Sequence, residues 1–243
     1  MTNNLHGGQG NIAGDQPEAG VVNVRHHPDD ELLLDYASGA LGEAESLVIA
    51  THMALCPICR RKVADYEAIG GATLEAAEAI PVADDALARI MASIDAGLSD
   101  KKSSEQVDFK SENFDANIPQ PLRDYLPSTL ENLPWQSVLR GLDEVTLQVG
   151  SNDMVRTKML RIQPGAAMPQ HTHEGTELTL VLCGAFQDER GHFARGDLAF
   201  TDSDVEHRPV ADEGAVCYCL AVTTAPLRLT GPVGRFFNPF IKY

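Results

Sequence analysis

GAAMPQHTHEGTELTLVLCG, residues 165–184, decides the fold expected for the second half of this chain. Its histidines, His171 and His173, are followed four residues later by Glu177, and glycines frame the stretch. The three side chains share parity, so in an extended strand they point to one face of a sheet. In a small barrel that face is the lumen. Imidazole and carboxylate groups there predict a metal site for zinc, iron(II), manganese or nickel.

A fourth ligand to this site is expected from His207, in the stretch DVEHRPV. On both sides of it the sequence has short β-branched, aromatic or alternating runs bounded by glycine, aspartate and proline, such as DEVTLQVG, MVRTKMLRIQPG and GDLAFTD. Many short strands without helices between them predict a sandwich or a barrel. Residues 119–243 are therefore expected to form an all-β domain.

Two cysteines, Cys217 and Cys219, lie two residues apart in one of these predicted strands. They face the same way, and the rise of a strand puts their Cα atoms ~6.7 Å apart, at the upper limit for a disulfide. One interpretation is a pair of small core residues. The other is a pair of thiols near the metal that respond to oxidant. Cys183 has the parity of Glu177 and is a further candidate to face inward.

The first half of the chain has helical periodicity instead. Residues 1–22 are polar and glycine-rich, and we expect a disordered tail. Residues 23–97 contain four helical segments: HPDDELLLDYASG, GEAESLVIATHMAL, PICRRKVADYEAIGG and ADDALARIMASIDAG. Gly39 is expected to end the first helix, and the glycine pair 70–71 to end the third. The charged, serine-rich residues 98–118 predict a flexible linker.

A second metal-ligating pattern, His52, Cys56 and Cys59, lies within these helices. Offsets of four and three residues place the three side chains on one helical face. Zinc takes four tetrahedral nitrogen and sulfur ligands, and the fourth is expected from His26 or His27, between which spacing alone does not choose. Such a closed site would be structural. A thioredoxin-like redox pair is disfavoured because no βαβ pattern surrounds the cysteines.

The fourth predicted helix carries an apolar stripe at the i, i+3, i+4, i+7 spacing of an amphipathic helix. The stripe consists of Leu87, Ile90, Met91 and Ile94. It would either pack in a core or bind a partner protein, and the spacing does not decide between the two.

Composition narrows the class of partner. The 243 residues carry a formal net charge of −16, so the chain is expected to avoid nucleic acid and to suit a basic protein. No apolar run approaches the ~20 residues of a membrane helix, and the N-terminus lacks a signal-peptide pattern. Five cysteines with one Cys-x-x-Cys favour metal or thiol chemistry over structural disulfides. We therefore expect a cytoplasmic protein without membrane contact.

Residues 26–63 resemble the zinc-binding anti-sigma domain, whose pattern is a histidine before the first helix and then His-x-x-x-Cys-x-x-Cys. On that resemblance the zinc ligands are His27, His52, Cys56 and Cys59, with His26 as the fallback for the first. The resemblance implies that this domain sequesters an extracytoplasmic-function sigma factor, inserts between its two domains and blocks its binding to RNA polymerase.

Residues 165–184 resemble the first cupin motif over its full length. The second cupin motif departs from the family pattern, since no proline stands two residues before Gly196 and Ala211 replaces a common asparagine. A four-helix zinc domain followed by a cupin β-barrel looks like the ChrR-type anti-sigma factors, which release their sigma factor during oxidative stress, notably from singlet oxygen. The resemblance implies that the helical domain binds the sigma factor and that the cupin, with zinc or another divalent metal, senses the signal.

Other functions are compatible with a metal in a barrel, because a fold does not determine function. The main alternative is a metal-dependent cupin enzyme, such as a dioxygenase, with the helical domain as a regulatory module. A metal-storage or zinc-sensing protein is a third. No catalytic triad or phosphate-binding loop is evident, so a non-enzymatic role is expected, and a homodimer through the cupin is a further expectation.

Overall fold

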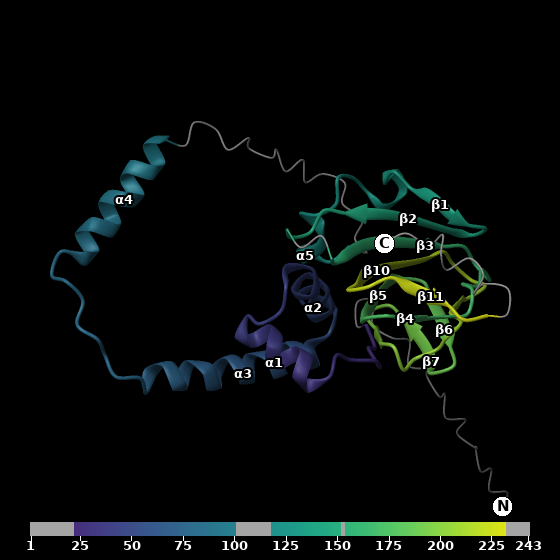
Figure 1. Cartoon of the computed structure of the whole chain (residues 1–243), viewed down its shortest axis with the longest axis horizontal. Coiled ribbons are helices and arrows are strands. Elements are labelled where there is room, and N and C mark those ends of the chain that lie inside the picture. The colour runs from purple at the N-terminus through teal and green to yellow at the C-terminus, as the bar shows by residue number, and fades with distance from the viewer. Residues whose placement is uncertain (1–21, 101–117, 152–153, 232–243) are drawn as a thin grey trace, which may run out of the picture.

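The computed structural model describes residues 22–100, 118–151 and 154–231, with helices first and strands after them (Figure 1). The helices are α1 (Asp30–Ser38), α2 (Glu43–Leu55), α3 (Pro57–Glu75), α4 (Ala86–Asp100) and the short α5 (Gln120–Arg123), followed by a 3-10 turn at Leu130–Asn132. The predicted tail and most of the predicted linker lie outside the described residues. None of the described helices combines the length and hydropathy needed to cross a membrane.

The helix ends follow local capping rules with one exception. Asp29 caps α1, its carboxylate accepting from the backbone N–H of Leu32, and Gly39 ends α1 at φ 72°, which confirms the predicted stop. The prediction that α3 ends at Gly70 and Gly71 is wrong, because the helix runs on to Glu75. Each glycine costs only about 1 kcal/mol relative to alanine, and the residues that follow do not break a helix.

The strands form three antiparallel sheets. The six-stranded sheet has the order β1 (Gln136–Leu139), β2 (Leu142–Leu147), β3 (Arg156–Ile162), β10 (Cys217–Thr223), β5 (Glu177–Cys183), β8 (Leu198–Thr201). The three-stranded sheet has the order β7 (Gly191–Ala194), β6 (Ala185–Asp188), β9 (Val210–Ala211), and β11 (Leu227–Leu229) pairs with β4 (His171–His173). The predicted order, a helical region followed by a region of antiparallel strands, is confirmed.

The central strands of the six-stranded sheet are buried on both faces, as the side chains of β5 show. In β5, Val181 faces a core shared with the three-stranded sheet, which includes Phe186 and Phe193. Its neighbours in sequence, Leu180 and Leu182, face a second core that includes the helices. One face of the sheet thus lines the interior of the barrel, while the other is covered by α2, against which α5 packs.

The helical and β regions therefore share one hydrophobic core, which separate domains would not have. Helix α2 is buried around most of its circumference, with Leu47, Val48 and Ile49 all almost fully buried. Ile118, assigned to the linker from the sequence, is fully buried in the same core. Each such side chain contributes about 1.5–3 kcal/mol when buried, so this contact resists separation. The domain boundaries drawn from composition remain predictions.

Helix α4 stands apart from the other elements, at the upper left of Figure 1. Its apolar stripe is largely solvent-exposed, from 49% for Ile94 to 72% for Leu87. Among the described residues the stripe therefore does not pack in a core, and binding of a partner stays a prediction.

Candidate metal centres

The structure brings together the four residues that the sequence placed at the first metal site. His27, His52, Cys56 and Cys59, here called the helical donor set, have candidate ligand atoms within 4.8 Å of one another. The Nδ1 atom of His27 lies 3.3 Å from the Sγ atom of Cys56 and 3.4 Å from that of Cys59. Cys56 ends α2 and caps α3 in an extended conformation, since Pro57 opens the new helix. This hinge turns both sulfur atoms toward the histidines.

The protonation chemistry of the helical donor set fits a bound cation. The Nδ1–H of His52 donates to the carbonyl oxygen of Gly196 at 2.8 Å, which leaves its buried Nε2 without a hydrogen-bond partner among the described residues. Burial lowers the pKa of His52 to about 4, so the ring is neutral and Nε2 holds a free lone pair. Burial and the neighbouring Cys56 raise the pKa of Cys59 to about 12. Without a metal this thiol stays protonated, and a bound metal such as zinc would displace the proton and hold the thiolate.

His26, the alternative fourth ligand, lies elsewhere. Its Nε2–H donates to the carbonyl oxygen of His192 at 3.1 Å, and its ring centroid lies 4.2 Å from that of Phe193. His26 therefore packs on the barrel while His27 faces the cysteines, a choice that spacing alone did not make.

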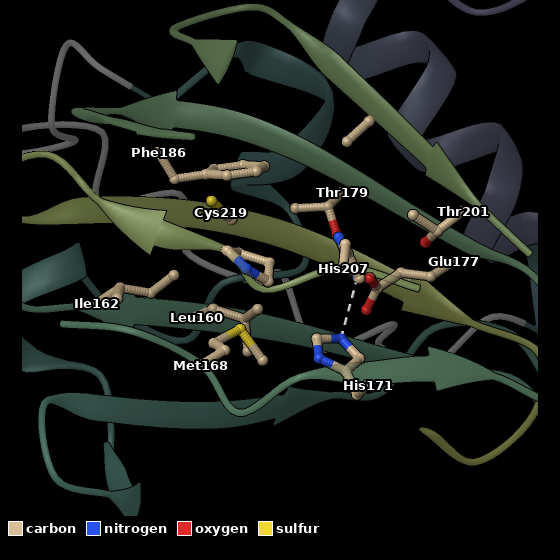
Figure 2. A pocket seen from close by; sticks show the side chains of 12 residues that line it. Leu160, Ile162, Met168, His171, Glu177, Thr179, Phe186, Thr201, His207 and Cys219 are labelled. Carbon is tan, nitrogen blue, oxygen red and sulfur yellow. Dashed lines mark hydrogen bonds between the residues drawn. The ribbon is translucent and has the colours of Figure 1, made fainter. Parts of the chain in front are cut away.

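His171, His173, Glu177 and His207, here called the barrel donor set, also converge within 4.8 Å of one another. Figure 2 shows three of them, His171, Glu177 and His207, inside the barrel. The expectation that His173 and Glu177 share one extended strand is wrong, because β4 ends at His173 and β5 begins at Glu177. A turn at 174–176 joins them, held by the hydroxyl oxygen of Thr224, which accepts from the N–H of Thr176. Backbone hydrogen bonds in both directions between His171 and His207 place those two side by side.

The barrel histidines present unprotonated nitrogen atoms to one another. The Nδ1–H of His171 donates to the carbonyl oxygen of Pro169, and that of His207 to the carboxylate of Asp188. Their Nε2 atoms lie 3.1 Å apart, and each then carries a lone pair that points toward the other. The two lone pairs repel each other unless a cation lies between them. Burial lowers the pKa of His171 and His173 to about 4. The 3.4 Å contact of His173 with Glu177 is consequently not an ion pair at neutral pH, and a shared metal explains it better.

Asp188 is a functional residue that the sequence did not single out. Its side chain is fully buried and accepts from both His207 at 2.9 Å and Arg190 at 2.8 Å. Although burial opposes ionisation, these hydrogen bonds hold the pKa of Asp188 well below its usual range. Such a carboxylate orients a metal-binding imidazole and raises its basicity. In sequence Asp188 looks like any aspartate before a turn, so no local signal marked it.

A small cavity of about 30 Å³ adjoins the barrel donor set. Its far side is lined by Leu160, Met168, Phe186 and Cys219 (Figure 2). It has room for roughly two molecules of water size. The Sγ atoms of Cys217 and Cys219 lie 3.6 Å apart in the core, and the Cys217 contact and burial raise the pKa of Cys219 well above its usual range. Cys183 is half-buried and does not line this cavity.

We expect the metal-free protein to lose stability as the pH falls from about 6.5 to about 4. His52, His171 and His173 have lowered pKa values near 4, so the unfolded state binds more protons in that window. Each histidine removes up to about 2 kcal/mol between pH 6.5 and pH 5. Urea unfolding at pH 7 and pH 5 measures the difference. A flat profile would contradict the assignment.

Comparisons with known proteins all point to one family, that of ChrR. Residues 127–226 match a family model described as the ChrR cupin-like domain. The chain is 38% identical over 221 residues to the anti-sigma-E factor ChrR of Cereibacter sphaeroides, covering 91% of this chain and 100% of that relative. It also matches a crystal structure of Rhodobacter sphaeroides SigE in complex with the anti-sigma ChrR, with 39% identity and a TM-score of 0.70, over 82% of this chain and 99% of that one.

Proposed function

We propose that this chain, which belongs to the ChrR family of anti-sigma factors, holds an extracytoplasmic-function sigma factor and releases it when its barrel senses an oxidant. A sigma factor as partner is supported by the solved relative, which is bound to SigE. The observation that carries the sensing half is the barrel donor set beside a small, thiol-lined cavity. The acidic chain needs no contact with nucleic acid or membrane for this, and it would act in the cytoplasm.

In the helical donor set, zinc is the metal we propose. His27, His52, Cys56 and Cys59 would hold it, and it would neutralise the thiolates and tie the segment before α1 to α2 and α3. A set of four protein donors closes the coordination sphere, so the role proposed is structural.

In the barrel donor set we propose zinc or another divalent metal, held by His171, His173, Glu177 and His207. The metal would supply a Lewis-acidic position facing the cavity. Cys217 and Cys219 are the proposed redox pair: a hydroperoxide would take two electrons and two protons from their thiols, leaving a disulfide, an alcohol and water. Burial of both thiols and the raised pKa of Cys219 make this pair slow to react with oxidant until the surrounding core loosens.

The size of the cavity favours sensing over catalysis on an organic substrate. Sites for small organic molecules usually enclose ~300–1,000 Å³, at least ten times the space here. A peroxide or dioxygen species matches the available room better than a dioxygenase substrate. Pairing of two copies through their barrels stays a prediction.

The exposed stripe on α4 is the surface we propose for the sigma factor. Ile90→Asp with Ile94→Asp should weaken binding at least tenfold, because two charges would enter an apolar contact. The free energy of unfolding should change by less than about 0.5 kcal/mol, since both residues are exposed. Titration of the full chain with a sigma factor encoded beside it measures the affinity.

The matched control for this stripe is Ala88→Asp with Ala92→Asp, which adds the same two charges one turn apart on another face of α4. Its affinity should stay within about threefold of the unchanged protein. Equal weakening by both pairs would mean that charge alone, and not the stripe, determines binding.

A further inference from the structure

The segment before α1 is bound to the turn between β7 and β8. Asp197, 1% exposed in this turn, accepts backbone hydrogen bonds from Arg25 at 2.6 Å and His26 at 2.9 Å through Oδ1. Its Oδ2 accepts from the N–H of Ala194 at 2.9 Å. In return, the N–H of Leu198 donates to the carbonyl oxygen of His26 at 3.0 Å. The residue that follows His26 in sequence belongs to the helical donor set.

Gly196, in the same turn, reaches the helical donor set directly. Its carbonyl oxygen accepts from Nδ1 of His52, which fixes the ring so that Nε2 is the free nitrogen. The residue has φ +90°, and a Cβ atom there would lie 2.8 Å from a methyl carbon of Val24 and 3.0 Å from one of Val22. Glycine is needed for both the backbone conformation and the close approach. Two of the four helical donors thus take their positions from barrel residues.

The hairpin formed by β6 and β7 links this contact to the other donor set. At one end of it, Asp188 receives the hydrogen bond of His207. On the neighbouring strand, His192 and Phe193 contact His26 through a carbonyl oxygen and a ring face. A single hairpin therefore contacts a ligand candidate of the barrel and the residue next to His27.

We propose that the β7–β8 turn, residues 195–197, is a clamp by which the barrel holds the helical donor set closed. Asp197 and Gly196 act as positioning residues for His27 and His52, and the β6–β7 hairpin passes changes in the barrel donor set to them. The proposal rests on the proposed metal binding of the helical set, and it assigns the path by which a change in the barrel would reach that set.

The test loads the full chain with Co²⁺. Two thiolate ligands give a sulfur-to-cobalt charge-transfer band that the nitrogen and oxygen donors of the barrel lack, so the band reports the helical set alone. Asp197→Ala should lose this band to excess chelator at least tenfold faster than the unchanged protein. Asp197→Asn keeps an acceptor oxygen for Arg25 and His26, and should fall between the two. Asp204→Ala removes an exposed carboxylate from the same domain and should have no effect.

Coupling is tested by combining variants. Introduced alone, His207→Ala should accelerate the loss of the cobalt band. Introduced together with Asp197→Ala, it should accelerate that loss little beyond the effect of Asp197→Ala itself. If the two effects multiply, the turn is not the path. The clamp itself is overturned if Asp197→Ala loses the cobalt band at the rate of the unchanged protein, or if Asp204→Ala loses it as fast as Asp197→Ala.

Two further measurements keep the test decisive. If Asp197→Ala fails to fold, amide hydrogen exchange in Asp197→Asn replaces it: faster exchange at Arg25 and His26 supports the clamp, and unchanged exchange overturns it. Sigma-factor binding by the unchanged chain is measured separately. If the unchanged chain does not bind the sigma factor, the proposed function is refuted. The rate of loss of the cobalt band still shows whether the clamp exists.

Discussion

Replacing both Cys56 and Cys59 by serine should weaken sigma-factor binding at least 100-fold, equivalent to about 2.8 kcal/mol. The change removes two of the four helical donors, and structural zinc of this kind is coupled to folding by about 10–16 kcal/mol. Without it, His27 and the segment before α1 lose their tie to α2 and α3. Titration of the full-length double variant with the sigma factor measures the loss.

The barrel should survive this substitution. Helix α2 would still bury Leu47 and Ile49 against the six-stranded sheet, so thermal unfolding should retain a cooperative barrel transition. Cys183→Ser is the matched control, because that cysteine is half-buried and outside both donor sets. Normal affinity in the double variant would show that sigma binding does not need the helical metal.

The sequence predicted the chemistry of both sites better than their surroundings, because ligand spacing is local. His52, Cys56 and Cys59 lie within two turns of helix, and His171, His173 and Glu177 within seven residues. Only His27 and His207 had to come from a distance, and both lie in motif-like stretches. Spacing alone could not separate His27 from His26, since the answer depends on Phe193 and His192 in the barrel.

What the sequence did not predict is non-local packing. The hydrogen bond from Arg25 to Asp197 joins residues 172 positions apart, and the one from His52 to Gly196 spans 144. Composition suggested separate domains because a polar linker divides them, yet a sheet with apolar residues on both faces needs a cover. Helix α2 supplies this cover, and it is buried around most of its circumference.

Replacing both His171 and Glu177 by alanine should abolish oxidant-induced release while leaving sigma binding within about threefold of normal. The two residues supply half of the barrel donor set and line the cavity, whereas neither contacts α4 or the helical donors. If the barrel signal contributes 1–3 kcal/mol to release, its loss removes a 5- to 150-fold change in affinity. Sigma-factor release on peroxide or singlet-oxygen treatment, followed in cells and with the purified complex, measures it.

The control for that experiment is Glu174→Ala with Glu206→Ala, two exposed carboxylates near the ligands in sequence. It should release the sigma factor normally. Replacing His171 removes a buried side chain, which can perturb the barrel itself. Glu177→Gln alone therefore serves as a milder variant that keeps the shape of the site. Unchanged release in both His171→Ala with Glu177→Ala and Glu177→Gln would separate the barrel donor set from sensing. Oxidant would then act through thiols alone, either those of Cys217 and Cys219 or the metal-bound sulfur atoms of Cys56 and Cys59, which remain oxidisable.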